Sequence, residues 1–129
     1  MLDILAQKIM KANLFIAKEF NFDSAHRLRN YNGPCSNLHG HTYKLQVILK
    51  GEIKKNGMVM DFTEIKDLVY KRVIQRLDHN FINKLIKQPT AENIAIWIWK
   101  QLEKKLPLYE IKLWETPSSY VIFRGSEDK

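Results

Sequence analysis

Hydrophobic and polar residues alternate in two stretches of the first half of the chain. In LFIAKEFNF, residues 14–22, one parity holds Leu14, Ile16, Phe20 and Phe22, with Lys18 as the interruption. In HTYKLQVIL, residues 41–49, the alternation is cleaner. Because successive side chains of a β-strand point to opposite faces, this period of two predicts two strands, each with one buried face.

Two stretches with helical periodicity follow. In TEIKDLVYKRVIQRL, residues 63–77, apolar side chains recur every three or four positions, and Asp61 or Thr63 is a suitable N-cap. In TAENIAIWIWKQLEKKL, residues 90–106, Thr90 is the expected cap, and a proline directly after the stretch ends it. The pattern predicts two amphipathic helices.

The chain returns to strand patterns near its end, with YEIKLWE at 109–115 and SYVIFRG at 119–125. A turn is expected between them at Pro117 and Ser118. The order is then strand, strand, helix, helix, strand, strand. Such segregation favours an α+β domain, namely a four-stranded antiparallel sheet with both helices on one face.

Length and cysteine content narrow the class of protein. A chain of 129 residues with 45% hydrophobic residues is long enough for one domain with a core. Its single cysteine cannot form an internal disulfide, which fits a reducing compartment. The N-terminal residues make a poor signal peptide, and no stretch is apolar enough to span a membrane. We therefore expect a cytoplasmic protein without a membrane partner.

The chain is basic, with 21 Lys and Arg against 14 Asp and Glu and a net charge of +7. The basic residues occur as scattered pairs rather than as a dense stripe with interleaved aromatics, so nucleic acid is not the expected partner. Such a surface favours anions in general, including small phosphorylated substrates. A lysine-rich solvated surface accounts for the charge equally well.

Three histidines carry the main chemical signal. In CSNLHGHTYKL, His39 and His41 are two residues apart and share the parity of the apolar residues that follow. In FNFDSAHRL, His26 has the parity of the preceding phenylalanines. If both segments are extended neighbours, three imidazoles share one face, which matches a catalytic zinc site with three protein ligands and an open position. Other divalent ions suit the same ligands. A single histidine of this kind is more often a buried or half-exposed structural group.

Two further features are candidates for proton transfer. Cys35 lies in a turn-forming stretch close to the histidines, where a lowered thiol pKa would make it a base or nucleophile. A lone cysteine is also commonly a small buried hydrophobe. In LDHN, Asp78 precedes His79, like the carboxylate-oriented histidine of a catalytic triad. The alternative for this pair is a favourable interaction with the C-terminal end of the helix dipole.

Six separated motifs together carry a resemblance to a known family. They are FDSAHRL at 22–28, CSNLHGHTY at 35–43, GMVMDF at 57–62, LDHNFIN at 77–83, PTAENIA at 89–95 and the closing WETPSSYVIFRG. In this order the chain resembles the 6-pyruvoyl-tetrahydropterin synthase family, and more closely its 6-carboxy-tetrahydropterin synthase (QueD) branch. The motifs cover about residues 14–125. We therefore expect a single domain, residues 1–129, in which residues 1–12 are an N-terminal extension.

The resemblance assigns a role to each candidate residue. It implies Zn²⁺ ligands at His26, His39 and His41, a catalytic base at Cys35, a proton relay at Asp78 and His79, an anchor for the pterin ring at Glu115, and pocket positions at Thr90 and Glu92. A carboxylate suits the pterin because it accepts two hydrogen bonds from a guanidine-like N–H pair. Without the family, Glu115 is a strand-end surface charge, and Thr90 and Glu92 are the cap and first turn of a helix.

The resemblance also implies a reaction and an assembly. The expected enzyme is a zinc-dependent lyase that converts 7,8-dihydroneopterin triphosphate to 6-carboxy-5,6,7,8-tetrahydropterin, acetaldehyde and triphosphate, in queuosine or related deazapurine biosynthesis. The expected fold is the tunnelling fold (T-fold), assembled as a homohexameric barrel, a dimer of trimers with pterin sites at subunit borders. Three residues separate Cys35 from His39, a short spacing that favours this branch. The alternatives are the pyruvoyl-forming activity on the same substrate and a non-catalytic metal- or nucleic-acid-binding module.

Overall fold

The computed structural model describes residues 14–33 and 36–127. Cys35, the expected base, lies outside the described residues, as does the predicted N-terminal extension. In chain order the elements are β1 (Phe15–His26), β2 (His39–Lys50), α2 (Phe62–Val69), a π-helical turn (Tyr70–Ile74), α3 (Gln75–Leu77), β3 (Asn80–Phe81), a 3₁₀ turn (Ile82–Lys84), α4 (Ala91–Leu102), β4 (Leu108–Thr116) and β5 (Ser119–Phe123).

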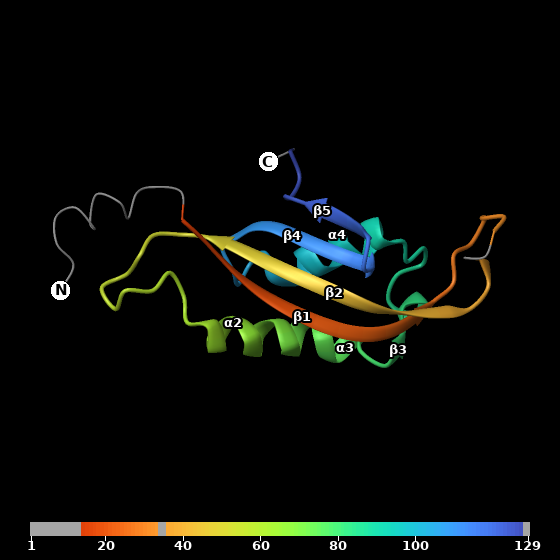
Figure 1. The fold of residues 1–129 in the computed structure, drawn as a ribbon, viewed down its shortest axis with the longest axis horizontal. Coiled ribbons are helices and arrows are strands. Elements are labelled where there is room, and N and C mark those ends of the chain that lie inside the picture. The colour runs from red at the N-terminus through yellow and green to blue at the C-terminus, as the bar shows by residue number, and fades with distance from the viewer. Residues whose placement is uncertain (1–13, 34–35, 128–129) are drawn as a thin grey trace.

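The strands form one open sheet in the order β3-β1-β2-β4-β5 (Figure 1). The four strands predicted from the sequence are present, and each pairs antiparallel with its neighbour. The predicted number of strands is nevertheless wrong, because β3 adds a fifth strand parallel to β1, pairing Ser24 with Asn80 and Ala25 with Phe81. A two-residue strand carries no alternation that a sequence pattern can reveal. The α+β class is confirmed.

The helical segments cover one face of this sheet. Figure 1 shows α2 and α3 running along β1, with α4 behind β2 and β4. On β2, Tyr43, Leu45, Val47 and Leu49 are fully buried, as their alternation predicted. They join the apolar side chains of both helical segments in a single core cluster. Both helical segments therefore pack on the same face, as predicted.

The first predicted helix is one continuous helical stretch with a change of geometry in the middle. Ile65, Val69, Val73 and Leu77 are all fully buried. They follow one another at steps of four residues, which overshoots one α-helical turn by about 40° per step. The wider π turn between α2 and α3 compensates for this drift and keeps the four side chains against the sheet. Among the described residues, no helix is long and apolar enough to cross a membrane.

The helix ends agree only partly with the sequence. Of the two candidate caps for α2, Asp61 is the N-cap, and its carboxylate accepts a hydrogen bond from the backbone of Thr63 at 2.8 Å. Thr90 caps α4, as predicted. α4 ends at Leu102, earlier than its pattern suggested, and the following residues form turns.

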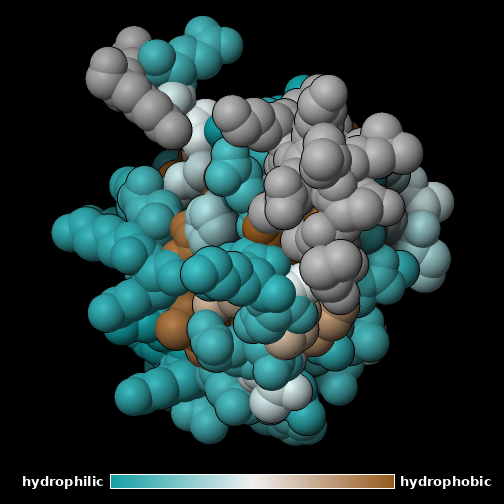
Figure 2. Space-filling view, turned by 90° about the vertical axis from the view of Figure 1, so that its left-hand side faces the viewer, coloured by the Kyte–Doolittle hydropathy of each residue, from teal (hydrophilic) through white to brown (hydrophobic). Residues whose placement is uncertain are grey.

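The end of the sheet opposite to the histidines is a solvated surface. The turn after β2 exposes Glu52, Lys54 and Lys55. Figure 2 looks onto this end and shows mainly hydrophilic side chains where the surface is coloured. The basic pair in this turn therefore fits the solvated-surface alternative.

Candidate metal centre

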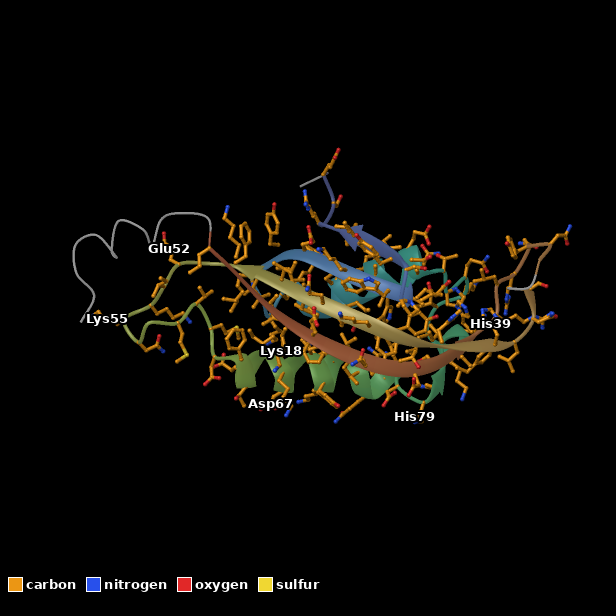
Figure 3. The ribbon with its side chains drawn as sticks, in the orientation of Figure 1. Lys18, His39, Glu52, Lys55, Asp67 and His79 are labelled. Atoms are coloured by element: carbon orange, nitrogen blue, oxygen red, sulfur yellow. The ribbon has the colours of Figure 1, made fainter. Side chains whose placement is uncertain are left out.

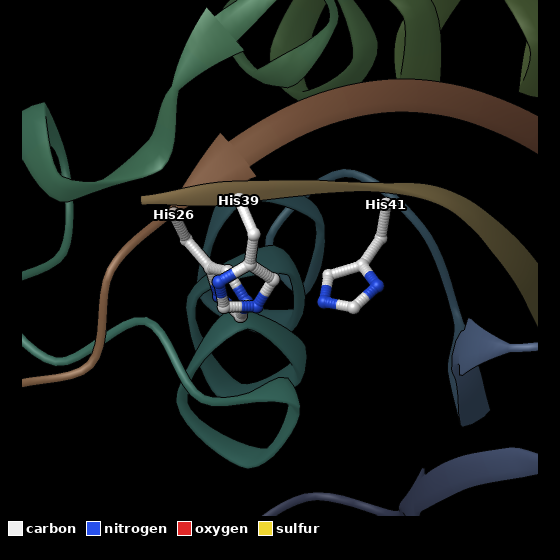
Figure 4. A group of neighbouring side chains, drawn as sticks. All are labelled: His26, His39 and His41. Atoms are coloured by element: carbon white, nitrogen blue, oxygen red, sulfur yellow. The ribbon is translucent and has the colours of Figure 1, made fainter. Parts of the chain in front are cut away.

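Three histidines meet where β1 ends and β2 begins. In the register of these strands His26 pairs with His39, and Ser24 pairs with His41. Strand alternation therefore places all three imidazoles on the face of the sheet that carries the core. Figure 4 shows the three rings close together on one side of the two strands. Both strands are extended as far as these histidines, so the two segments are the extended neighbours that the sequence analysis required for a shared face.

The three rings are packed at angles that bring their nitrogens together. The ring centroids lie 4.5 Å apart for His26 and His39, 5.0 Å for His26 and His41, and 4.8 Å for His39 and His41, each pair edge to face. One ring nitrogen from each histidine lies within 4.8 Å of the other two. Donor atoms grouped this closely can hold one metal ion between them.

Hydrogen bonds to carbonyl groups fix the tautomers of two rings. The Nδ1 of His26 lies 2.7 Å from the carbonyl oxygen of Pro89, and the Nδ1 of His39 lies 2.8 Å from that of Asn37. A carbonyl oxygen only accepts, so both Nδ1 atoms donate, and in the neutral rings both Nε2 atoms carry lone pairs. These two Nε2 atoms are 2.9 Å apart. The two lone pairs repel each other at this distance, and a cation bound by both nitrogens would remove this repulsion.

The third ring, that of His41, also has a nitrogen that is available to a metal ion. The Nε2 of His41 is buried and, among the described residues, it has no hydrogen-bond partner. The nearest carboxylate oxygen, Oε1 of Glu115, is 3.9 Å away, beyond hydrogen-bond distance. A buried polar atom without a partner is rare in folded proteins. The residues present therefore fit a bound metal ion.

Burial also favours the protonation state that a metal requires. It is the largest cause that lowers the pKa of His26 and of His41, although the Pro89 carbonyl opposes it at His26 and the Glu115 carboxylate opposes it at His41. Neutral imidazoles are the form that coordinates metals. Three neutral nitrogen ligands without a carboxylate suit Zn²⁺ with an open fourth position, and other divalent ions as well.

Glu115, Thr90 and Glu92 lie together beside the histidines. They border a hollow of about 270 Å³, which Leu28 also lines. The side chain of Glu115 is only 26% exposed, so it is not a freely solvated charge at a strand end. The hydroxyl of Thr90 accepts a hydrogen bond from the backbone of Asn93 at 3.1 Å, which confirms its capping role. The hollow has a half-buried hydrogen-bond acceptor, Glu115, at one side and the start of α4 at the other.

Asp78 and His79 belong to a separate group at the edge of the sheet. The Nδ1 of His79 lies 3.1 Å from Oδ2 of Asp78, so the pair suggested by the sequence exists. The backbone of Asp23 donates to the other Asp78 oxygen at 2.9 Å, and Thr42 donates to the Asp23 carboxylate at 2.5 Å. By strand alternation Asp23 and Thr42 lie on the face opposite to the three imidazoles. Figure 3 labels His79 and His39 at separate places on the ribbon.

The environment of this second group differs from that of the first. His79 is 80% exposed, whereas its carboxylate partner is 35% exposed. The hydrogen bond from the Asp23 backbone is the largest cause that lowers the pKa of Asp78. Burial opposes this shift, and the contact with His79 adds to it. Sequence reasoning missed Asp23 and Thr42, whose only signal was their polar character on the outer parity of the two strands. The carboxylate stays ionised beside an accessible imidazole.

Comparisons with known proteins agree with this architecture. Residues 15–126 match the family model described as 6-pyruvoyl tetrahydropterin synthase. A Haemophilus influenzae protein named 6-carboxy-5,6,7,8-tetrahydropterin synthase is 40% identical over 133 residues, covering 81% of this chain and 94% of its own. A Pyrococcus furiosus protein named dihydroneopterin monophosphate aldolase is 44% identical over 99 residues, covering 74% and 83%. The solved Caenorhabditis elegans 6-pyruvoyl tetrahydropterin synthase matches with a TM-score of 0.80 at 28% identity, covering 88% of this chain and 96% of that chain.

Proposed function

Because the chain belongs to the 6-pyruvoyl tetrahydropterin synthase family, we propose that it is a zinc-dependent 6-carboxy-5,6,7,8-tetrahydropterin synthase. Its substrate is 7,8-dihydroneopterin triphosphate, and its products are 6-carboxytetrahydropterin, acetaldehyde and triphosphate. The product enters queuosine or related deazapurine biosynthesis. The observation that carries the proposal is the group of His26, His39 and His41. The Nε2 atoms of His26 and His39 face each other, and among the described residues the buried Nε2 of His41 has no hydrogen-bond partner.

His26, His39 and His41 are the residues that would hold the ion. When bound, Zn²⁺ supplies Lewis acidity that makes protons on the substrate side chain easier to remove. The carbonyl groups that accept from Nδ1 of His26 and His39 keep the rings oriented, which is the usual role of outer contacts around a metal site. The protein therefore provides a preformed, neutral ligand set.

Proton transfer is assigned to three residues. Cys35 accepts a proton from the substrate side chain, as a general base. Asp78 and His79 adjust the protonation of this thiol, with Asp78 held ionised by the Asp23 backbone. His79 is exposed, which suits a group that exchanges protons with an approaching thiol or with water. In this assignment His79 takes part in proton transfer and is not a metal ligand.

The pterin ring is assigned to the hollow beside His41. The carboxylate of Glu115 accepts a pair of hydrogen bonds from the guanidine-like edge of the ring. Its position 3.9 Å from His41 supports this role, because a ring anchored there has its side chain close to the histidines. Thr90 and Glu92 border the same hollow and complete its wall.

We propose further that the chain assembles as a homohexamer, a dimer of trimers, with its sites at subunit borders. The proposal rests on the family and on the separation of the two groups within one chain. The open sheet, with β5 at one edge, offers unpaired backbone groups for a neighbouring subunit. Light scattering that gives a monomer at micromolar concentration would contradict this assembly.

A second candidate is the pyruvoyl-forming activity on the same substrate. The similarity to the C. elegans 6-pyruvoyl tetrahydropterin synthase favours it. The three-residue spacing between Cys35 and His39 favours the carboxy-forming reaction, because a shorter loop places the thiol differently over the substrate side chain. Both candidates share the ligands and the anchor, and they differ in whether the side chain is also cleaved, with release of acetaldehyde, after triphosphate leaves.

Product analysis decides between them. The purified chain is incubated with 7,8-dihydroneopterin triphosphate, with and without a metal chelator, and the products are identified by mass spectrometry with a separate assay for acetaldehyde. Acetaldehyde release that the chelator abolishes supports the proposal. Triphosphate release with a pyruvoyl product supports the second candidate. Because of the P. furiosus relative, dihydroneopterin monophosphate is tested in parallel, and turnover of that compound alone would contradict both.

A further inference from the structure

A cationic hollow opens just beyond the end of β1. Its volume is about 940 Å³, and its lining includes Arg27, Arg29 and Lys84. The remaining lining residues are neutral, and no Asp or Glu is among those that the structure describes. In Figure 1 the loop that carries the arginines extends past the strand at the end of the molecule where β3 lies. This size falls within the usual range for ligand sites.

These three cations lack the carboxylate partners that surface cations commonly have. Elsewhere in the chain Arg124 contacts Glu110 at 2.8 Å, and Lys44 contacts Glu19 at 3.4 Å. Across residues 14–33 and 36–127, Arg27, Arg29 and Lys84 take part in no ion pair. Arg27 uses its Nε to donate to the carbonyl of Ser36 at 2.8 Å, which orients the guanidinium without neutralising it. Three uncompensated positive charges around one hollow attract a polyanion.

Two side-chain amides hold the arginine-bearing segment in place. Asn83 accepts from the backbone N–H of Arg27 and donates to its carbonyl, both at 2.9 Å. Gln88 makes the same pair of bonds to Arg29, at 2.7 Å and 2.8 Å. Each side-chain amide thus forms hydrogen bonds with both the N–H and the carbonyl group of one arginine, as the backbone of a neighbouring strand would. The backbone of both arginines is fixed by contacts that leave their charged groups available to a ligand.

The position of the hollow connects it to the site described above. Arg27 directly follows His26, and Leu28 lines both this hollow and the one that contains Glu115. A guanidinium group binds phosphate through two parallel N–H···O hydrogen bonds, and an ammonium group adds a point charge. We propose that the hollow is an oligophosphate-binding site, in which Arg27, Arg29 and Lys84 bind the phosphate tail of the substrate. Asn83 and Gln88 are positioning residues. The assignment of the tail rests on the proposed function, whereas the binding of an oligophosphate does not.

The direct test uses inorganic triphosphate as the probe and the full chain. Isothermal titration calorimetry at fixed ionic strength compares the wild type with Arg29→Gln, Lys84→Gln and the control Lys55→Gln. Lys55 carries the same charge but lies at the other end of the molecule from His39 (Figure 3). Loss of one charged contact is expected to weaken binding about ten- to hundred-fold. The control should stay within about two-fold.

Three results of this titration would overturn the proposal. They are no binding of triphosphate to the wild type, an equal loss in the control variant, and equal affinity for inorganic monophosphate and triphosphate. Equal losses in all three variants would mean that the probe responds only to net charge. Equal affinity for the two anions would mean that a single phosphate occupies the hollow and that the cations do not act together.

A double-mutant cycle tests the positioning role. Gln88→Met removes both bonds to Arg29 while keeping the length of the side chain. It is expected to weaken triphosphate binding as much as Arg29→Gln, and the two changes combined should cost little more than either alone. Lys84→Gln should add its full effect to Gln88→Met. Additive losses for Gln88→Met and Arg29→Gln would show that Gln88 does not act through Arg29.

Turnover separates this proposal from the proposed function. If both hold, Arg29→Gln raises the KM for dihydroneopterin triphosphate and leaves the zinc content unchanged. If the chain binds inorganic triphosphate but does not turn over the pterin, the hollow is an oligophosphate-binding site and the enzymatic assignment is wrong. If the pterin is converted with an unchanged KM in Arg29→Gln and Lys84→Gln, the enzymatic assignment stands and the hollow is not the substrate's phosphate site.

Discussion

The chain contains two groups built around histidine, and they lie against the same two strands in different surroundings. His26, His39 and His41 sit on the core face, and burial lowers the pKa of the first and third. His79 lies at the edge of the sheet, 80% exposed, with its Nδ1 facing Asp78. The first environment keeps imidazoles neutral and their lone pairs together, which suits metal binding. The second places one imidazole beside a carboxylate and solvent, which suits proton transfer.

Removing a ligand from the first group is expected to have the largest effect. His39→Ala should lower turnover of dihydroneopterin triphosphate by at least about a thousand-fold, because loss of the ion removes several kcal/mol of charge stabilisation. Steady-state kinetics measures this effect, with circular dichroism to confirm folding. Activity within ten-fold of the wild type would show that the three histidines are not the reactive centre.

A change in the second group should be smaller and should leave the metal in place. His79→Ala is expected to lower kcat about a hundred-fold, the usual contribution of a general acid or base. Asp78→Asn should have a similar effect, since it removes the charge beside Nδ1. Zinc content, measured on the same samples, should stay at the wild-type level. Loss of zinc from either variant would erase the distinction between the two groups.

The helix cap beside the first group offers a test on stability. Thr90→Ala should lower the free energy of unfolding by about 1 kcal/mol, because it removes the hydrogen bond to the Asn93 backbone. Asp61→Ala removes the cap of α2 and should cost a similar amount. Denaturant titration compares the two variants, and kinetics then separates their roles. Only the Thr90 change should raise the KM for the pterin, and an equal KM in both variants would limit Thr90 to capping.

The smallest expected effect is on the pH dependence of the metal-free chain. Burial lowers the pKa of His26 and His41 in the folded state, so the unfolded chain takes up protons first as the pH falls below about 6.5. The free energy of unfolding should therefore be level above that pH and decline below it. Thermal unfolding in the presence of a chelator, between pH 8 and pH 5, measures this trend.

A ligand variant tests the origin of this decline. His41→Asn should reduce it, because the change removes one of the two groups whose pKa burial lowers. Asp78 contributes at lower pH than the histidines. Because its pKa is lowered in the folded chain, its stabilisation is lost only in acid, as the pH falls below the usual range of a carboxyl group. A decline that persists unchanged in His41→Asn would place its origin outside the histidine group.

The first group was predictable from the sequence, and the second only in part. Parity along two strands placed the three imidazoles on one face, because alternation is a local property that the fold preserves. The link between Asp23 and Asp78 joins residues 55 positions apart. Likewise, Asn83 holds Arg27 from 56 positions away, in a part of the chain with no regular pattern. Such contacts depend on how the elements pack, which no local periodicity encodes.

The same limit applies to the fold. Alternation and helical spacing predicted the four main strands and both helical segments, and Thr90 was identified as a cap because capping is also local. The short β3 and the π turn were not foreseen. β3 forms because the chain leaving α3 runs beside β1, where the hydroxyl of Ser24 donates to the carbonyl of Leu77. Tertiary packing, not a local residue pattern, creates β3.

The zinc content of the purified chain shows whether the three histidines bind a metal ion. Inductively coupled plasma mass spectrometry is applied to the wild type, His41→Ala and His79→Ala after dialysis against zinc-free buffer. His41 is chosen because, among the described residues, its buried Nε2 has no hydrogen bond to lose. We expect about one zinc per chain in the wild type and in His79→Ala, and almost none in His41→Ala. Equal zinc content in His41→Ala and the wild type, or loss of zinc from His79→Ala alone, would contradict this expectation.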